Sequence, residues 1–189
     1  MNRREAISRV AWILGGTVIG AELFVDFACT PKADKVNDLF DKDQLAFLDE
    51  VAETILPATK TPGAKEARVG QFMTVMVQDC YTPEDQKVFI NGISELDKAC
   101  KKENGKGFME CNAEQRTAFL TRLDKEQKLY NEKKKAEEPN HYFTMMKQLT
   151  LLGFFTSEIG ATQALRYVEI PGRFDGCAPY KTGDRAWAT

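Results

Sequence analysis

The sequence predicts an all-α fold: a single helical domain of about five to six helices with a long irregular C-terminal tail, preceded by an N-terminal signal segment. Three observations support this prediction. Apolar residues recur at helical spacing through most of residues 41–160, capping sequences precede several of these runs, and no useful stretch alternates apolar with polar residues as a half-buried strand does. After a signal of about 28 residues, about 160 remain, which is enough for one domain with its own core.

The first two predicted helices lie in the N-terminal half of the domain. Asp41 and Gln44 have the spacing of a capping box that starts the first helix, and Pro57 ends it. A turn follows, and the second helix reaches about residues 79–80. The apolar faces consist of Leu45, Leu48, Val51, Ala52 and Ile55 in the first helix, and of Val69, Phe72, Met73 and Met76 in the second.

Capping residues also mark the next two predicted helices. Thr82 followed by Pro83 supplies an N-cap and a proline at the first helical position. Glycines at 105 and 107 form a turn, after which Asn112 and Gln115 cap a fourth helix that fades into the charged segment 124–138. Their apolar faces consist of Phe89, Ile93, Leu96 and Cys100, and of Phe119, Leu120 and Leu123.

A fifth helix is predicted from about Pro139. Its continuation over 151–155 has no polar face, so this part must be deeply buried or covered by another protein. The pattern also allows a short helix from Ser157. Residues 169–189 are rich in proline and glycine and are expected to form an ordered loop without regular structure.

The N-terminus has the features of a twin-arginine export signal. Arg3 and Arg4 precede Ile7 and a mildly apolar run over 10–21. An ordinary secretory signal is the alternative, and both place the mature chain outside the cytoplasm, in the periplasm. The apolar run of 12 residues is too short to span a bilayer, which needs about 20.

The signal segment, 1–29, ends near a possible lipidation site. A small residue precedes Cys29, as in lipoprotein cleavage sites, although Asp26 departs from that pattern, so simple removal or retention of the signal stays open. We expect a polar tether over 30–40 and the helical domain over 41–189. Membrane association would come from the lipid or from a complex.

The chain has five cysteines. With Cys29 set aside, an even number remains, which in an oxidising compartment predicts two disulfides. Cys100 and Cys111 flank a Gly-rich connection that can bring two helix ends together, and this pairing leaves Cys80 for Cys177. A metal site is disfavoured because no Cys-x-x-Cys spacing occurs and the single histidine has no neighbouring ligand pattern.

Charge and motifs exclude several classes of function. Lys and Arg number 26 against 28 Asp and Glu, so nucleic acid is not an expected partner. The chain lacks a dinucleotide fingerprint, a phosphate loop and a haem c motif, and we predict no catalytic, cofactor or metal site in it. A hydrolase using His141 or Glu158 is a minor alternative. The preferred interpretations are a surface or capping role for His141 and, for Glu158, pairing with Arg166 or a hydrogen bond to a loop amide.

Several strings, in order, resemble the gluconate 2-dehydrogenase subunit 3 family. The longest are Gly153-Phe154-Phe155-Thr156-Ser157-Glu158-Ile159-Gly160 and Pro171-Gly172-Arg173-Phe174-Asp175-Gly176-Cys177. The others lie at 55–59, 61–64, 79–81, 83–86, 149–151 and 165–167. The resemblance covers about residues 40–187.

This resemblance implies a small, cofactor-free subunit. Family members accompany an FAD-containing sugar or polyol dehydrogenase of the glucose–methanol–choline type, often with a cytochrome c subunit. The small subunit carries the export signal, so the resemblance implies an escort that takes the folded flavoprotein through the twin-arginine translocon and then stabilises it. The competing hypothesis is an autonomous periplasmic or lipid-anchored protein that binds a small molecule along 149–160.

We expect the partner surface to involve the apolar segment 149–155 and the tail 166–187. Aromatic residues and arginine concentrate at the centres of interfaces, and the tail offers little regular structure of its own in which to bury them. The residues predicted to contact the partner are Leu149, Phe154, Phe155, Arg166, Tyr167, Arg173, Phe174, Tyr180 and Trp187.

Overall fold

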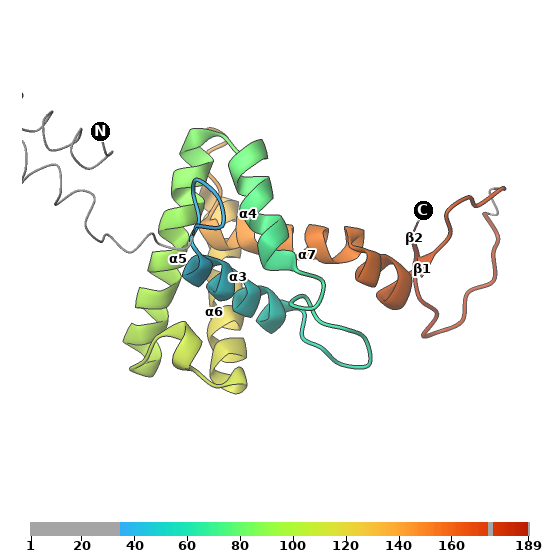
Figure 1. The fold of residues 1–189 in the computed structure, drawn as a ribbon, viewed down its shortest axis with the longest axis horizontal. Coiled ribbons are helices and arrows are strands. Elements are labelled where there is room, and N and C mark those ends of the chain that lie inside the picture. Colours follow the sequence, from blue (N-terminus) through green and yellow to red (C-terminus); the bar gives the residue numbers. More distant parts are fainter. Residues whose placement is uncertain (1–34, 174–175, 189) are drawn as a thin grey trace, which may run out of the picture. The chain divides into compact units, whose positions relative to one another are not determined.

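The computed structural model describes residues 35–173 and 176–188, and in them the prediction of an all-α fold is confirmed (Figure 1). Five α-helices, of which the first two are separated by a longer connection over 56–68, are followed by the tail. The helices are α3 (Lys42–Ile55), α4 (Val69–Cys80), α5 (Pro83–Asn104), α6 (Ala113–Lys133) and α7 (Tyr142–Thr156), with a 3₁₀ turn η1 (Phe108–Glu110), a π-helical segment η2 (Gly160–Ala164) and the strands β1 (Arg166–Tyr167) and β2 (Trp187–Ala188).

The capping residues predicted from the sequence start α3, α5 and α6. The Asp41 Oδ1 atom accepts a hydrogen bond from the Gln44 amide at 2.7 Å, and Thr82 and Asn112 accept equivalent bonds at the starts of α5 and α6. Each bond satisfies one of the amides that a first helical turn leaves without an internal partner. Gly105 ends α5 in the left-handed conformation, with φ 76°, which glycine adopts without steric cost.

Helix α7 is the central element of the core. It contacts α3, α4, α5 and α6, and Figure 1 shows it running through the bundle and beyond it. Its side chains at Phe143, Met146 and Leu149 are buried among the other four helices. This placement explains why much of α7 has no polar face.

Two glycines allow α7 to pack closely against its neighbours. A Cβ atom on Gly92 of α5 would lie 2.3 Å from the Cβ of Tyr142, and one on Gly153 of α7 would lie 2.6 Å from a ring carbon of Phe72. Neither contact leaves room for a methyl group. The bundle therefore depends on glycine at two helix crossings, a requirement that the sequence pattern did not reveal.

Carboxylates on α3 hold the connection between α3 and α4. The two oxygens of Glu53 accept hydrogen bonds from the amides of Ala58 and Lys65, both at 2.8 Å. Asp49 accepts a bond of 3.0 Å from the Gly70 amide and so caps α4, whose preceding residue supplies no side-chain cap. Neighbouring Glu50 forms ion pairs with Lys65 and with Arg116 of α6.

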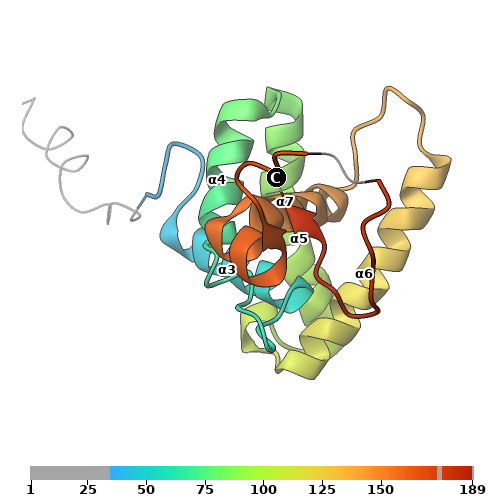
Figure 2. The same ribbon diagram turned by 90° about the vertical axis from the view of Figure 1, so that its right-hand side faces the viewer.

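The region after α7 differs from the prediction. A five-residue π-helix follows where a short regular helix was allowed, and the tail is not wholly irregular, because β1 and β2 form a short parallel pair. Figure 2 shows this end of the domain facing the viewer. No helix in the described part of the chain is both long and apolar enough to cross a bilayer. Arg3, Arg4, Ile7, Cys29 and Phe174 lie outside the described residues.

Candidate partner-binding surface

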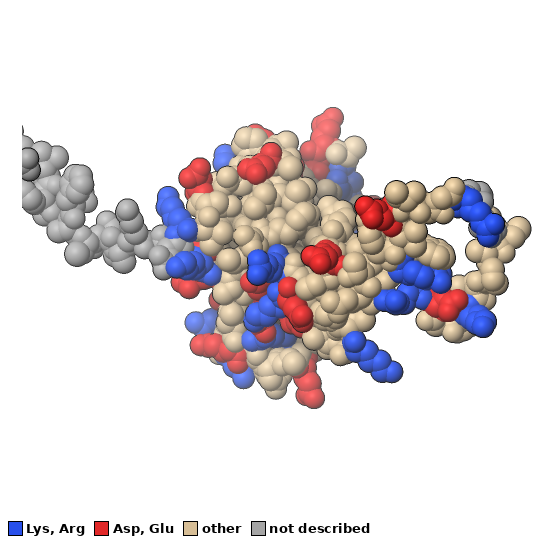
Figure 3. Space-filling view, turned by 45° about the vertical axis from the view of Figure 1, so that its right-hand side comes forward, with Lys and Arg blue, Asp and Glu red and all other residues tan. Residues whose placement is uncertain are grey.

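The C-terminal half of α7 exposes three large apolar side chains, which we call the apolar end of α7: Leu151, Leu152 and Phe155. They are 38%, 47% and 39% exposed. Exposure of adjacent large apolar side chains is costly in water unless another surface covers them. Figure 3 shows a wide area without charged side chains on the face of the molecule in view.

Within the predicted interface segment 149–155, the structure separates core from surface. Leu149 and Phe154 are 3% and 4% exposed and pack inside the domain. They are therefore unavailable to a partner in this conformation, which corrects their assignment to the interface. Phe155 is exposed as the assignment requires. The helical rotation of about 100° per residue places neighbours on different sides of α7.

The described part of the tail forms a loop, which we call the tail loop, residues 168–173 and 176–186. Its two ends are joined by hydrogen bonds from the Arg166 amide to Ala186 O at 2.8 Å and from the Val168 amide to Ala188 O at 2.9 Å. The Arg185 guanidinium donates to the carbonyl oxygens of Thr162 and Gln163 at 3.2 and 2.9 Å, which ties the loop to the end of η2. The tail loop therefore has a fixed base.

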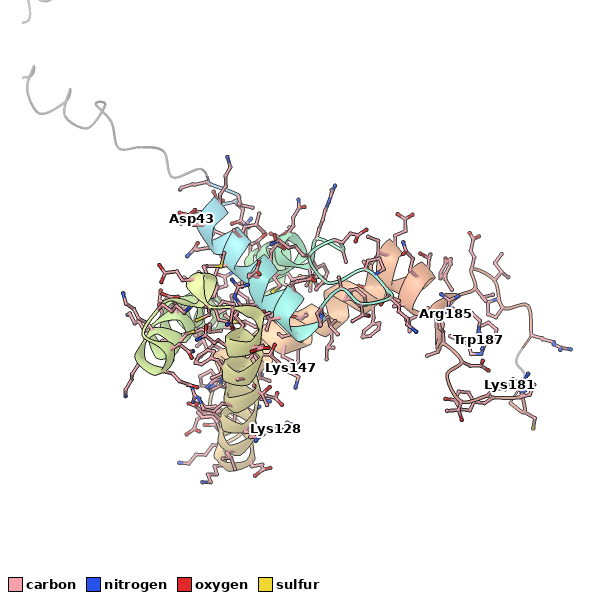
Figure 4. All side chains as sticks on the ribbon, turned by 90° about the horizontal axis from the view of Figure 1, so that it is seen from below. Asp43, Lys128, Lys147, Lys181, Arg185 and Trp187 are labelled. Carbon is pink, nitrogen blue, oxygen red and sulfur yellow. The ribbon has the colours of Figure 1, made fainter. Side chains whose placement is uncertain are left out.

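Exposed aromatic side chains lie at the base of the tail loop and within it. Trp187 is 56% exposed, and the Arg166 guanidinium carbon lies 3.6 Å from its ring centroid, a close cation–π contact. Tyr167 and Tyr180 are 49% and 75% exposed. Figure 4 shows Arg185 and Trp187 near the helices and Lys181 further out along the loop. Arg166 therefore already has a contact within the chain, with the Trp187 ring.

His141 and Glu158, the two candidates for acid–base chemistry, do not lie in a common site. His141 caps α7, with Nδ1 accepting a bond of 3.2 Å from the Phe143 amide, and it packs between Tyr130 and Tyr142. Burial lowers the pKa of His141. Glu158 is exposed. Arg166, its expected ion-pair partner, stacks on Trp187 instead.

The helical bundle has shallow hollows among its described residues. One of about 350 Å³ lies between α3 and α5 and includes Asp41, Asp43 and Asp97, and one of about 260 Å³ lies between α3, α6 and α7. Residues 149–160 line neither of them. No cluster of three or more metal-ligating side chains occurs in residues 35–173 and 176–188. The surface features that stand out are thus the apolar end of α7 and the tail loop.

The structure brings one of the two predicted cysteine pairs together. The sulfur atoms of Cys100 and Cys111 lie 3.5 Å apart, both buried, which is a contact between thiols and not a disulfide. Cys80 and Cys177 are exposed and are not bonded to each other. Neither predicted disulfide is therefore present in this structure.

An all-α domain with an exposed apolar helix end and a projecting loop is typical of a protein that binds another protein. The comparisons with known proteins agree. The family model for gluconate 2-dehydrogenase subunit 3 matches residues 42–172, and the chain belongs to this family. The family implies an accessory subunit of a dehydrogenase complex and therefore a partner dehydrogenase. Searches of the curated proteins and of the solved structures found no match.

Proposed function

We propose that this chain is a non-catalytic small subunit that binds the folded catalytic subunit of a dehydrogenase and escorts it out of the cytoplasm through the twin-arginine translocon. The catalytic subunit we propose is an FAD-containing sugar or polyol dehydrogenase of the glucose–methanol–choline type. A cytochrome c subunit is a further candidate member of the complex. The assembled complex would reside in the periplasm, associated with the membrane.

The observation that carries this proposal is the exposed surface formed by the apolar end of α7 and the aromatic base of the tail loop. The η2 segment, Gly160–Ala164, contacts α7 on one side and β1 on the other, so it connects the two parts of the surface. Leu152 and Trp187 are about half exposed. Contact with a folded partner would remove both side chains from water.

The tail loop adds polar recognition to this surface. Lys181 and Arg185 are exposed on it, and Figure 3 shows basic side chains gathered on the loop. Arginine and aromatic side chains are enriched at the centres of protein interfaces. Because the base of the loop is fixed by main-chain hydrogen bonds, binding would order fewer groups than binding of an unstructured tail.

Export depends in this proposal on Arg3, Arg4 and Ile7, which precede the domain in the sequence. The twin-arginine pathway transports proteins that are already folded, so one signal can serve a preassembled complex. After export, acylation at Cys29 would provide a membrane anchor. The FAD would belong to the partner, and this chain would supply neither cofactor ligands nor catalytic groups.

The test is to purify the tagged chain from its native envelope and to measure flavin absorbance and dye-linked sugar dehydrogenase activity in the eluate. A larger, yellow partner is expected. Leu152→Asp should reduce its recovery at least tenfold. Leu129→Asp on α6 is the matched control, because Leu129 is 54% exposed and lies on another helix.

Two results would contradict the proposal. A chain that elutes alone and colourless from its own envelope, while the dehydrogenase is present, would favour the autonomous binding protein. Equal loss of the partner with Leu152→Asp and Leu129→Asp would place the interface elsewhere.

For export, replacing Arg3 and Arg4 by lysine should leave both proteins in the cytoplasm. A partner that still reaches the periplasm would limit the signal to this chain.

A further inference from the structure

Two cysteines meet at the junction between α5 and α6. Cys100 lies in the last turns of α5, and Cys111 directly follows η1. Gly105, in the left-handed conformation, turns the chain back between them. The two sulfur atoms are 3.5 Å apart, and the side chains are 0% and 4% exposed.

The main chain around the pair is fixed by groups other than sulfur. The Asp97 Oδ1 atom of α5 accepts a hydrogen bond of 2.8 Å from the Phe108 amide. On the other side, Arg116 donates from Nε to Phe108 O at 3.0 Å and from Nη2 to Met109 O at 2.8 Å. Phe108 is fully buried and packs against Phe47 and other core rings. The approach of the two thiols is therefore a consequence of the fold.

The environment of the pair does not suit a catalytic thiol. Burial raises the pKa of Cys100 to about 11, although Asn104 donates a hydrogen bond to its sulfur. A nucleophilic cysteine needs a lowered pKa and an accessible sulfur. No third metal-ligating side chain completes a cluster with the pair among the described residues. Covalent joining of the two sulfur atoms is the chemistry that remains for such a contact.

We propose that Cys100 and Cys111 form an intrachain disulfide when the chain meets an oxidised dithiol protein or a low-molecular-weight disulfide. A disulfide requires the sulfur atoms to approach to about 2.05 Å. The proposal does not depend on which partner the chain binds.

The reaction is two successive thiol–disulfide exchanges. The Cys111 thiolate, on the slightly more exposed side chain, attacks one sulfur of the oxidant RSSR, and the RS⁻ that leaves is protonated to RSH. Cys100 then loses its proton and attacks the Cys111 sulfur, which expels the second RS⁻, protonated in turn. Two protein thiols lose two electrons and two protons, and one RSSR becomes two RSH.

The bond would join the end of α5 to the start of α6. It closes a loop of 12 residues, counting both cysteines, which restricts the unfolded chain. For a domain of this size, loop closure of that length predicts a Tm higher by roughly 6–12 °C, reversible by a reducing agent.

The experiment uses the full chain, incubated with oxidised glutathione, then alkylated in denaturant and mapped by mass spectrometry without reduction. A peptide pair linked through Cys100 and Cys111 is expected, together with the rise in Tm. Cys100→Ser should abolish both the link and the rise, whereas Cys80→Ser should leave them unchanged.

Slow reaction of buried thiols is covered by a second measurement. The reduced, denatured chain is refolded in a buffer of oxidised and reduced glutathione and mapped in the same way. The same link is expected. Recovery of Cys100 and Cys111 as alkylated thiols or glutathione adducts after refolding, or links of either residue to Cys80 or Cys177, would overturn the proposal.

Discussion

The two halves of α7 have contrasting environments. Its N-terminal half is enclosed by the other helices, where Phe143 and Met146 are fully or almost fully buried. Its C-terminal half extends toward the tail, where Leu152 and Phe155 remain substantially exposed. One continuous apolar stretch therefore serves two purposes. The enclosed half stabilises the domain, and the exposed half leaves large apolar side chains accessible, which is where we propose that the partner binds.

The contrast is sharpest between the neighbours Phe154 and Phe155, 4% and 39% exposed. Phe154→Ala should lower the free energy of unfolding by about 3–5 kcal/mol, because it leaves a cavity in the core. Phe155→Ala should cost less than about 1 kcal/mol and should weaken partner binding. Urea unfolding and partner recovery measure both effects. Equal destabilisation by the two changes would remove the distinction between the buried and exposed sides of the C-terminal half.

A change at the enclosed half tests its close packing. Gly92→Ala would place a methyl group 2.3 Å from the Tyr142 Cβ, so the helices must separate. We expect the free energy of unfolding to fall by about 1–3 kcal/mol, even though alanine has a higher helix propensity than glycine. Asn91→Ala, at the exposed preceding position, is the control and should be neutral or slightly stabilising. Thermal unfolding distinguishes them, and a stable Gly92→Ala variant would show that the crossing tolerates a side chain.

The polar edge of the enclosed half gives a pH-dependent prediction. Burial raises the pKa of Asp124, but hydrogen bonds from Lys147 of α7 and from Lys128 outweigh this effect and lower the pKa to about 2 (Figure 4). Since this value is below the ordinary 3.8, the carboxylate stabilises the fold above about pH 4, and the contribution disappears as the pH falls toward about 2.

Asp124→Asn should therefore lower the free energy of unfolding by about 1 kcal/mol at pH 7. The difference in this free energy between the variant and the unmodified protein should vanish between about pH 4 and pH 2. Denaturant titrations over this range measure it. Asp184→Asn in the tail loop is the control and should leave the unfolding free energy of the bundle unchanged. A difference that persists at pH 2 would show that the amide changes packing and not charge.

The smallest effect on global stability is expected at the tail. Trp187→Ala removes the stacking partner of Arg166 but no core contact of the bundle. The free energy of unfolding should therefore change by less than about 0.5 kcal/mol. Hydrogen exchange at the Arg166 and Val168 amides, which close the loop, should become faster. Global destabilisation above about 1 kcal/mol would show that the tail supports the bundle.

The sequence by itself determined the helices and the capping residues that start α3, α5 and α6. Each capping side chain, at Asp41, Thr82 and Asn112, accepts a hydrogen bond from the amide three residues further on, and Gly105 ends α5 through its own backbone conformation. Each effect is therefore local and visible in the sequence. The family followed from strings in fixed order, which the family model over 42–172 confirmed. The resemblance also implied a partner, because a subunit family presupposes a complex.

Only the tertiary structure decided which apolar residues of 149–155 face inward, because helices on several sides of α7 compete to cover it. It also revealed that α3 carboxylates cap α4 and hold the preceding connection, bonds that join residues up to 21 positions apart. The closing of the tail loop by Arg166 and Trp187 likewise joins distant residues. Local pattern cannot predict such contacts, since they depend on where the other elements pack.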